Sequence, residues 1–156
     1  LKENVQLVIL GTGEPVLEQA YRELHKQFPK KCGVRIAYDN RLAHLIEAGS
    51  DIFLMPSRYE PCGLNQMYSL RYGTIPIVRN TGGLADTIRD IDQDPNGNGF
   101  VFDPIDPEPF FDTCLRALQY YQNEPAWNSL IKRAMSQDFS WNRTARLYAE
   151  LYKQIL

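Results

Sequence analysis

The sequence has no long apolar run, almost no excess of charge of one sign and few cysteines, and each absence excludes a class of protein. No apolar stretch approaches the roughly 20 residues that a helix needs to cross a bilayer, so we expect no membrane partner. The formal net charge is only −2, which gives no sign of the basic surface that binds nucleic acid. With 44% hydrophobic and 23% charged residues, the chain has the composition of a soluble globular protein.

The cysteines and acids form no pattern that points to a metal. Cys32, Cys62 and Cys114 are odd in number and far apart, and their spacing is not that of a metal site. We interpret them as thiols in a reducing cytoplasm. The Asp-containing stretch 91–106 lacks the spacing of a calcium-binding loop, so we interpret its acids as turn formers. The sequence therefore predicts no metal cofactor.

Short apolar runs alternate with segments of helical periodicity along most of the chain. Strands are expected at Val5–Leu10, Val34–Tyr38, Asp51–Met55, Ile75–Val78 and Phe100–Phe102. Helices are expected between successive strands and through the last third. This alternation predicts an α/β fold, a Rossmann-like doubly wound parallel sheet with helices on both faces. We expect a single domain over 1–156, with a helical C-terminal portion 107–156.

The helices of the last third carry apolar and aromatic side chains at helical spacing, which we interpret first as core. The residues assigned to the first of these helices are Phe111, Leu115 and Leu118. Those assigned to the final helix are Ala145, Tyr148, Leu151 and Tyr152.

Two polar, glycine-containing loops follow two successive expected strands. The first contains Glu60 and Gly63, and the second contains Gly82 and Gly83. Open α/β sheets bind ligands at the edge where strands end and helices begin, and free N–H groups at a helix N-terminus suit phosphate. Any one of these glycines is explained equally well by a tight turn. The two loops together, with an acid between them, favour a ligand site.

Two further strand ends lie at the same expected edge. The turn at Gly11–Gly13 is not a dinucleotide fingerprint, since the third glycine would fall at Val16, and a strand-to-helix turn explains it equally well. Tyr38 closes the second strand. The default interpretation of this tyrosine is a core or rim aromatic, and the alternative is stacking on a flat purine.

Three runs of sequence carry a family resemblance. They are Ser57–Leu64, with its Glu-Pro-Cys-Gly-Leu string, then Arg71–Pro76, and Thr81–Thr87, with Thr-Gly-Gly-Leu-Ala-Asp-Thr. They closely resemble the bacterial glycogen synthase and plant starch synthase family, whose members are retaining glucosyltransferases of the two-lobed GT-B architecture. The resemblance extends from the Leu10–Gly13 turn to Asp138–Trp141. It implies the C-terminal, nucleotide-sugar-binding lobe of an enzyme that transfers glucose from ADP-glucose to the non-reducing end of an α-1,4-glucan, without a metal.

The resemblance also implies roles for individual residues. Glu60 would be catalytic, contacting the donor glucose and supporting the reacting centre. Cys62 and Gly63 would hold sugar hydroxyls, largely through the backbone, and Tyr38 would lie against the nucleotide base. The residues near the phosphates or beside the nucleotide would be Leu64, Asn65, Thr81, Gly82, Gly83, Gly11 and Thr12. The partners would be ADP-glucose, ADP and, through the full enzyme, an α-1,4-glucan.

What is missing limits the expected activity. Many retaining GT-B enzymes have a second Glu eight positions after the first, and here that position is Tyr68. Glycogen and starch synthases generally lack this second Glu too, so the difference fits the narrower family. It leaves the ribose without an obvious acidic partner. The family's diphosphate-binding Arg and Lys, its Lys-Gly-Gly motif and its N-terminal-lobe histidine are absent from this sequence. Because the chain begins Leu1-Lys2-Glu3 without Met, we expect a longer enzyme, with its N-terminal acceptor lobe absent here. The isolated chain is expected to bind nucleotide weakly and to transfer no glucose. Its location would be the cytoplasm, or the plastid in a plant.

Two alternatives stay open. The chain could belong to another GT-B enzyme that uses a UDP-sugar, which the Glu-Pro-Cys-Gly-Leu string disfavours and a preference for ADP or UDP would decide. It could instead be a non-catalytic glucan-binding or scaffold module. Retention on glycogen without nucleotide would identify that module, but no exposed aromatic pair in a loop suggests a sugar platform.

Overall fold

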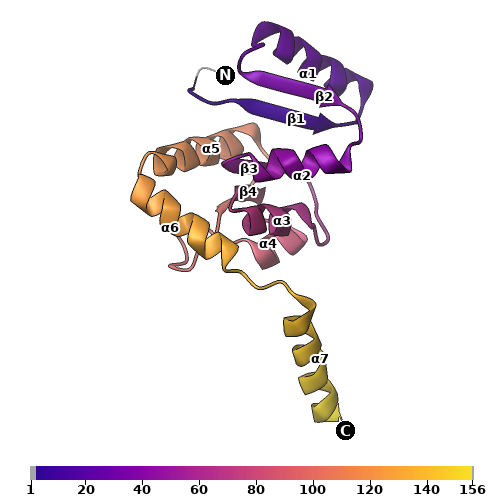
Figure 1. The fold of residues 1–156 in the computed structure, drawn as a ribbon, viewed down its shortest axis with the longest axis vertical. Coiled ribbons are helices and arrows are strands. Elements are labelled where there is room, and N and C mark those ends of the chain that lie inside the picture. The colour runs from indigo at the N-terminus through magenta and orange to yellow at the C-terminus, as the bar shows by residue number, and fades with distance from the viewer. Residues whose placement is uncertain (1–2, 156) are drawn as a thin grey trace. The chain divides into compact units, whose positions relative to one another are not determined.

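The computed structural model describes residues 3–155 (Figure 1). Leu1, Lys2 and Leu156, and with them the outer limits of the expected 1–156 domain, lie outside the described residues. The chain divides into two compact units, the first ending at Ile46 and the second beginning at Glu47. Each unit is described by itself, and the expectation of a single domain stays a prediction.

The first unit is a strand–helix–strand passage. It contains β1 (Leu7–Gly11), α1 (Pro15–Gln27) and β2 (Cys32–Ile36), and β1 pairs with β2 in parallel. The second strand begins two residues before its expected start, because Leu7 donates its N–H to the Lys31 carbonyl over 2.7 Å and so fixes the register there. Helix α2 (Asn40–Ala48) follows and leads into the second unit.

Two helix starts in this part of the chain have identifiable causes. Pro15 occupies the first turn of α1, where a residue without an N–H is tolerated. The Asp39 carboxylate accepts the Leu42 N–H over 2.9 Å and caps α2.

The second unit is built on a three-stranded parallel sheet with β4 in the centre. The strands are β3 (Ile52–Met55), β4 (Ile75–Arg79) and β5 (Phe100–Phe102), in the order β3-β4-β5. Pro76 is tolerated in this central strand because of where its missing N–H points. The Ile75 N–H bonds the Asp51 carbonyl on the β3 side, so position 76 faces β5, whose pairing begins only at Ile77.

Four helices accompany this sheet: α3 (Asn65–Tyr72), α4 (Gly82–Thr87), α5 (Pro107–Tyr121) and α6 (Glu124–Met135). Gly73 ends α3 in the left-handed region with φ 83°, a conformation that glycine adopts readily. The buried apolar core of this unit comprises Leu70, Ile75, Ile77, Val78, Leu84, Ile88, Phe100, Phe102, Ala117, Trp127, Leu130 and Ala134. The order of strands and helices is the predicted one throughout.

The prediction that the aromatic face of the last third is core was wrong for Phe111 of α5 and for the whole of α7 (Trp141–Ile155), whereas Leu115 and Leu118 of α5 are half-buried. In α5 the buried positions are Thr113 and Ala117, whereas Phe111 is 57% exposed. Helix α7 has no buried residue, and its predicted core residues Tyr148 and Tyr152 are exposed. In α7 periodicity identified an apolar face but did not show whether another element covers it, and in α5 the packed face is the one next to the predicted face.

Among residues 3–155, no helix combines the length and the apolar character that crossing a membrane requires.

Candidate functional site

The strongest sequence prediction, two loops at one sheet edge, corresponds to the loops that follow β3 and β4. These strands are parallel neighbours, so both loops leave the sheet at its carboxyl edge. The predicted site residues lie in these loops and in the first residues of the helices that follow them: Glu60, Cys62, Gly63 and Leu64, with Asn65 at the start of α3, and Thr81, with Gly82 and Gly83 at the start of α4. All of them belong to the second unit.

The two loops are in direct backbone contact. Gly83 donates its N–H to the Glu60 carbonyl over 2.9 Å. A Cβ on Gly83 would lie 2.2 Å from the Cys62 carbonyl oxygen, and a Cβ on Gly82 would lie 2.2 Å from that of Glu60. These glycines therefore permit the close approach of one loop to the other. The Gly83 N–H is already engaged, so it is not a free donor for a phosphate.

Free polar groups remain at the start of α3. Glu60 is half-buried, and within residues 3–155 its carboxylate forms no hydrogen bond or ion pair. The backbone N–H groups of Cys62, Gly63 and Leu64 likewise donate to no other group in that range. Gly63 has φ 73°, a left-handed conformation that turns the chain into the helix. A carboxylate and unpaired N–H donors thus lie within five residues of one another in sequence.

Arg79 joins the ends of all three strands of the second unit. Its Nη1 donates to the Ser57 carbonyl over 3.3 Å and to the Arg58 carbonyl, and its Nε donates to the Asp103 carbonyl over 3.3 Å. The neighbouring Asn80 donates its side-chain N–H to the Asp103 carboxylate over 2.6 Å. The start of the Glu60 loop is therefore fastened to the sheet by a side chain that the sequence analysis did not single out.

The remaining predicted residues, Gly11, Thr12 and Tyr38, belong to the first unit. The Ala37 N–H donates to the Gly11 carbonyl over 3.2 Å, so the turn after β1 and the segment after β2 lie together at one edge. Tyr38 is 89% exposed, which excludes a core role within the described residues and leaves its ring available for stacking. Each group of predicted residues is therefore assembled within its own unit.

Sequence reasoning missed Gln66 and Thr87. Gln66 is fully buried in α3, and its side chain donates hydrogen bonds to the Cys62 carbonyl of the first loop and to the hydroxyl of Thr87, the last residue of α4. A signal was available, because Gln66 lies four residues before Leu70 on the apolar face of the expected helix. A polar side chain on a core face must find buried partners.

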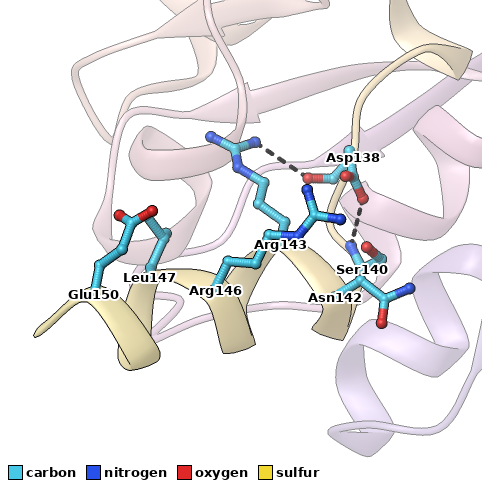
Figure 2. Close-up of a pocket in the computed structure, with 7 residues that line it drawn as sticks. All are labelled: Asp138, Ser140, Asn142, Arg143, Arg146, Leu147 and Glu150. Atoms are coloured by element: carbon cyan, nitrogen blue, oxygen red, sulfur yellow. Dashed lines mark hydrogen bonds between the residues drawn. The ribbon is translucent and has the colours of Figure 1, made fainter. Parts of the chain in front are cut away.

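Two hollows lie elsewhere on the second unit. The one in Figure 2, about 420 Å³, is lined by Asp138, Ser140, Asn142, Arg143, Arg146, Leu147 and Glu150. In it Arg143 donates to the Asp138 carbonyl over 3.2 Å, and the Asp138 carboxylate accepts the Ser140 N–H over 2.9 Å. The other, about 520 Å³, lies between α3 and the segment before α7 and includes Leu64. Leu64 is the one predicted site residue that lines either hollow.

No candidate metal site is found among the side chains that the structure describes. Within residues 3–155, no three or more His, Cys, Asp or Glu side chains are placed to hold a metal ion. Cys62 is exposed, whereas burial raises the pKa of the Cys114 thiol to about 11. The prediction that no cofactor is needed stays a prediction.

Comparison with known proteins gives the family. The model of the glycosyl transferases group 1 matches residues 1–135, most of the chain. The chain belongs to the glycosyl transferase group 1 family. Its similarity is high to a glycogen synthase of Koribacter versatilis, 53% identical over 98% of the chain, and to one of Thioalkalivibrio sulfidiphilus, 50% identical over 98%. The chain spans 32% of the length of each of these relatives.

A solved glycosyltransferase structure is similar in fold. The catalytic domain of starch synthase IV from Arabidopsis thaliana, bound to ADP and acarbose, aligns with a TM-score of 0.85 and 40% identity. The alignment covers 96% of this chain and 32% of that one. The predicted α/β class and the resemblance to glycogen and starch synthases are thereby confirmed. Parallel sheets flanked by helices are the fold of a GT-B lobe.

Proposed function

We propose that this chain is the nucleotide-sugar-binding lobe of a glycosyltransferase that transfers glucose from ADP-glucose to the end of an α-1,4-glucan. The observation that carries the proposal is the pair of glycine loops, locked together at the sheet edge, with the Glu60 carboxylate and the N–H groups of 62–64 left without partners among the described residues. The glycogen synthase relatives and the starch synthase bound to ADP and acarbose support the choice of substrates.

The chemistry of glucosyl transfer explains why these groups are suitable. As the bond from glucose to the diphosphate breaks, negative charge develops on the leaving phosphate, and fixed N–H donors at that place lower the barrier. Gly63 and Leu64 supply such donors at the start of α3, where the helix dipole also favours an anion. Glu60 is placed before them, as a carboxylate that can accept hydrogen bonds from sugar hydroxyls and support the reacting centre.

We assign recognition of the base to Tyr38. Tyr38 presents an almost fully exposed ring, and such a ring stacks on a purine at little conformational cost. Cys62 would contact the sugar through its backbone. Asn65, Thr81 and Gly82 would contact the phosphates, and Gly11 and Thr12 would lie beside the nucleotide. Gly83 would serve the site by holding the Glu60 loop, since its N–H is donated to that loop.

Calorimetric titration of the chain with ADP and with UDP tests the proposal. We expect ADP to bind more tightly than UDP, and Tyr38→Ala to weaken ADP binding by about tenfold, the loss expected when a stacking contact is removed. Tyr21→Ala is the matched control, because Tyr21 is also an exposed tyrosine of the first unit and lies in α1. Glu60→Gln should weaken ADP-glucose binding more than ADP binding.

Other outcomes would favour the alternatives. Tighter binding of UDP would indicate a UDP-sugar enzyme of the same fold. Retention on glycogen without nucleotide binding would indicate a glucan-binding module. We expect the chain alone to incorporate no glucose into glycogen, and measurable incorporation would contradict the proposed dependence on a second lobe.

A further inference from the structure

Gln66 of α3 is a polar side chain buried in the second unit. It is 0% exposed, and its Nε2 lies within hydrogen-bonding distance of three acceptors. These are the Cys62 carbonyl at 2.9 Å, the Gly63 carbonyl at 3.1 Å and the Thr87 hydroxyl at 3.2 Å. Its Oε1 is buried and accepts no hydrogen bond within residues 3–155. Burial of an unpaired amide oxygen is costly, so its retention calls for an explanation.

Gln66 is one end of a relay that links both glycine loops. The Thr87 hydroxyl accepts from Gln66 and donates to the Gly83 carbonyl over 2.6 Å. The Gly83 N–H in turn donates to the Glu60 carbonyl over 2.9 Å. The relay therefore begins and ends in the same loop, at Cys62 and Gly63 on one side and at Glu60 on the other.

The relay fixes which way the unpaired N–H groups point. In a trans peptide the carbonyl and the N–H of the following residue point in opposite directions. Gln66 draws the Cys62 and Gly63 carbonyls inward, so the N–H groups of Gly63 and Leu64 are directed away from it. The left-handed backbone of Gly63 belongs to the same arrangement. Gln66 packs so close to it that a Cβ on residue 63 would lie 2.4 Å from the Gln66 Oε1.

We propose that Gln66 and Thr87 are positioning residues, which hold the N–H groups of Gly63 and Leu64 and the backbone of Glu60 in the orientation that binds the sugar diphosphate. This inference rests on the proposed function of the site. Neither side chain touches the substrate. They act through the two carbonyls of the Glu60 loop and through Gly83. The same orientation explains why Oε1 has no partner. If the Gln66 amide were turned over, its Oε1 would face the Cys62 and Gly63 carbonyl oxygens, and neither can donate a hydrogen bond.

Binding measurements on a small set of variants test this role. Gln66→Met keeps the length of the side chain but removes the donor together with the unpaired oxygen. Thr87→Val removes the hydroxyl at nearly constant shape, and Thr87→Ser restores it. We expect Gln66→Met and Thr87→Val to weaken ADP-glucose binding by roughly tenfold, the loss expected for a misplaced charge-assisted hydrogen bond, with adenosine binding within about twofold. Thr87→Ser should bind ADP-glucose like the unmodified chain.

Thr113→Val is the matched control. Thr113 is also a buried threonine, but its hydroxyl donates to the Pro109 carbonyl of its own helix and to neither loop. It should leave the binding of both ligands unchanged. Equal ADP-glucose binding by Gln66→Met and the unmodified chain would overturn the proposal, and so would a parallel loss of adenosine binding, which would indicate general damage to the fold.

Amide resonances supply a measurement that needs no ligand. In Gln66→Met we expect the backbone amide signals of Gly63 and Leu64 to shift and those of Ile77 and Leu130, in the core, to stay in place. Unmoved Gly63 and Leu64 signals would contradict the orienting role directly. If these signals move but the unmodified chain binds neither ADP-glucose nor adenosine, the relay stands and the proposed function loses its support.

Discussion

At the scale of single residues, the loop glycines are explained by how closely one loop approaches the other. The sequence indicated that Gly82 and Gly83 would let the backbone approach an anion. The structure shows that the space beside each is filled by the carbonyl of Cys62 or Glu60. Their substitution should therefore damage the fold of the second unit before any ligand is considered.

Gly83→Ala is expected to destabilise the protein. Its new methyl group would lie 2.2 Å from the Cys62 carbonyl oxygen and 2.4 Å from the Cys62 Cα, and neither backbone atom can move without displacing the loop. Overpacking of this kind costs about 1–3 kcal/mol. The measurement is the midpoint of urea unfolding. Gly13→Ala is the control, because nothing lies within 4 Å of a Cβ there, and its midpoint should be unchanged or slightly higher.

Sequence reasoning found the residues that suggest a ligand by their type, and it missed the residues that support them through contacts. Glu60 and the glycines stand out because an acid and flexible backbone at a strand end suggest a ligand. Gln66, Thr87 and Arg79 act through backbone carbonyls that only the folded chain brings near them. No sequence spacing encodes which carbonyl a buried amide will reach, so these supporting contacts required the structure.

At the scale of elements, one ion-pair network fastens α5 to the sheet of the second unit. Arg116 in α5 donates to both oxygens of Asp90 over 2.8 and 2.6 Å, and also to Asp92. The Asp90 carboxylate further accepts the Val101 N–H of β5 over 2.7 Å. The Arg116 guanidinium lies over the Phe100 ring, 5.1 Å from its centroid. Asp92, one of the acids that the sequence analysis interpreted as turn formers, and the neighbouring Asp90 thus both bind an arginine.

This network should make stability depend on pH. Burial raises the pKa of Asp90, but hydrogen bonds from Arg116, Asp92 and Val101 outweigh burial and hold the pKa below its usual value. A carboxyl with a lowered folded-state pKa contributes stability above its unfolded pKa, and the contribution is lost as pH falls through the folded value. We expect the unfolding temperature to fall as the pH is lowered below about 4.

Asp90→Asn tests the origin of that dependence. Because the Asp90 side chain is only 3% exposed, its loss leaves Arg116 without its main partner and should cost roughly 3 kcal/mol at pH 7. The variant should also lose part of the fall in unfolding temperature at acid pH. The exposed Asp112 on α5 is the control, and Asp112→Asn should retain both the stability and its pH dependence. An unaltered acid transition in Asp90→Asn would show that other carboxyls cause it.

The boundaries of helices and strands can be predicted from the sequence where one residue sets them. They cannot be predicted where strand pairing sets them. Gly73 ends α3 and Pro15 begins α1, because the backbone preference of each acts within one residue. The start of β2 at Cys32 depends on a hydrogen bond from Leu7, about 25 residues away in the chain. In α5, helical spacing placed Phe111 in the core, but the sheet packs against the neighbouring face.

At the scale of the whole molecule, the sequence predicted the α/β class and the order of every element, because alternating periodicities survive without tertiary information. It did not predict the exposure of α7. Whether another element covers an apolar face depends on tertiary packing. Spacing along the chain cannot show this, because the sequence pattern of an apolar face is the same whether the face is covered or exposed.

Hydrogen exchange should distinguish α7 from α6 in the isolated chain. Helix α6 buries Trp127, Leu130 and Ala134, so opening it exposes core and costs a large part of the unfolding free energy. Helix α7 has 15 residues, and none of its residues is buried. A single helix of that length is only marginally stable in water. We expect the α7 amides to exchange at least tenfold faster than those of α6. Equal protection would mean that a partner, such as a second copy of the chain, covers the face of Tyr148 and Tyr152, and protection that grows with protein concentration would identify that copy.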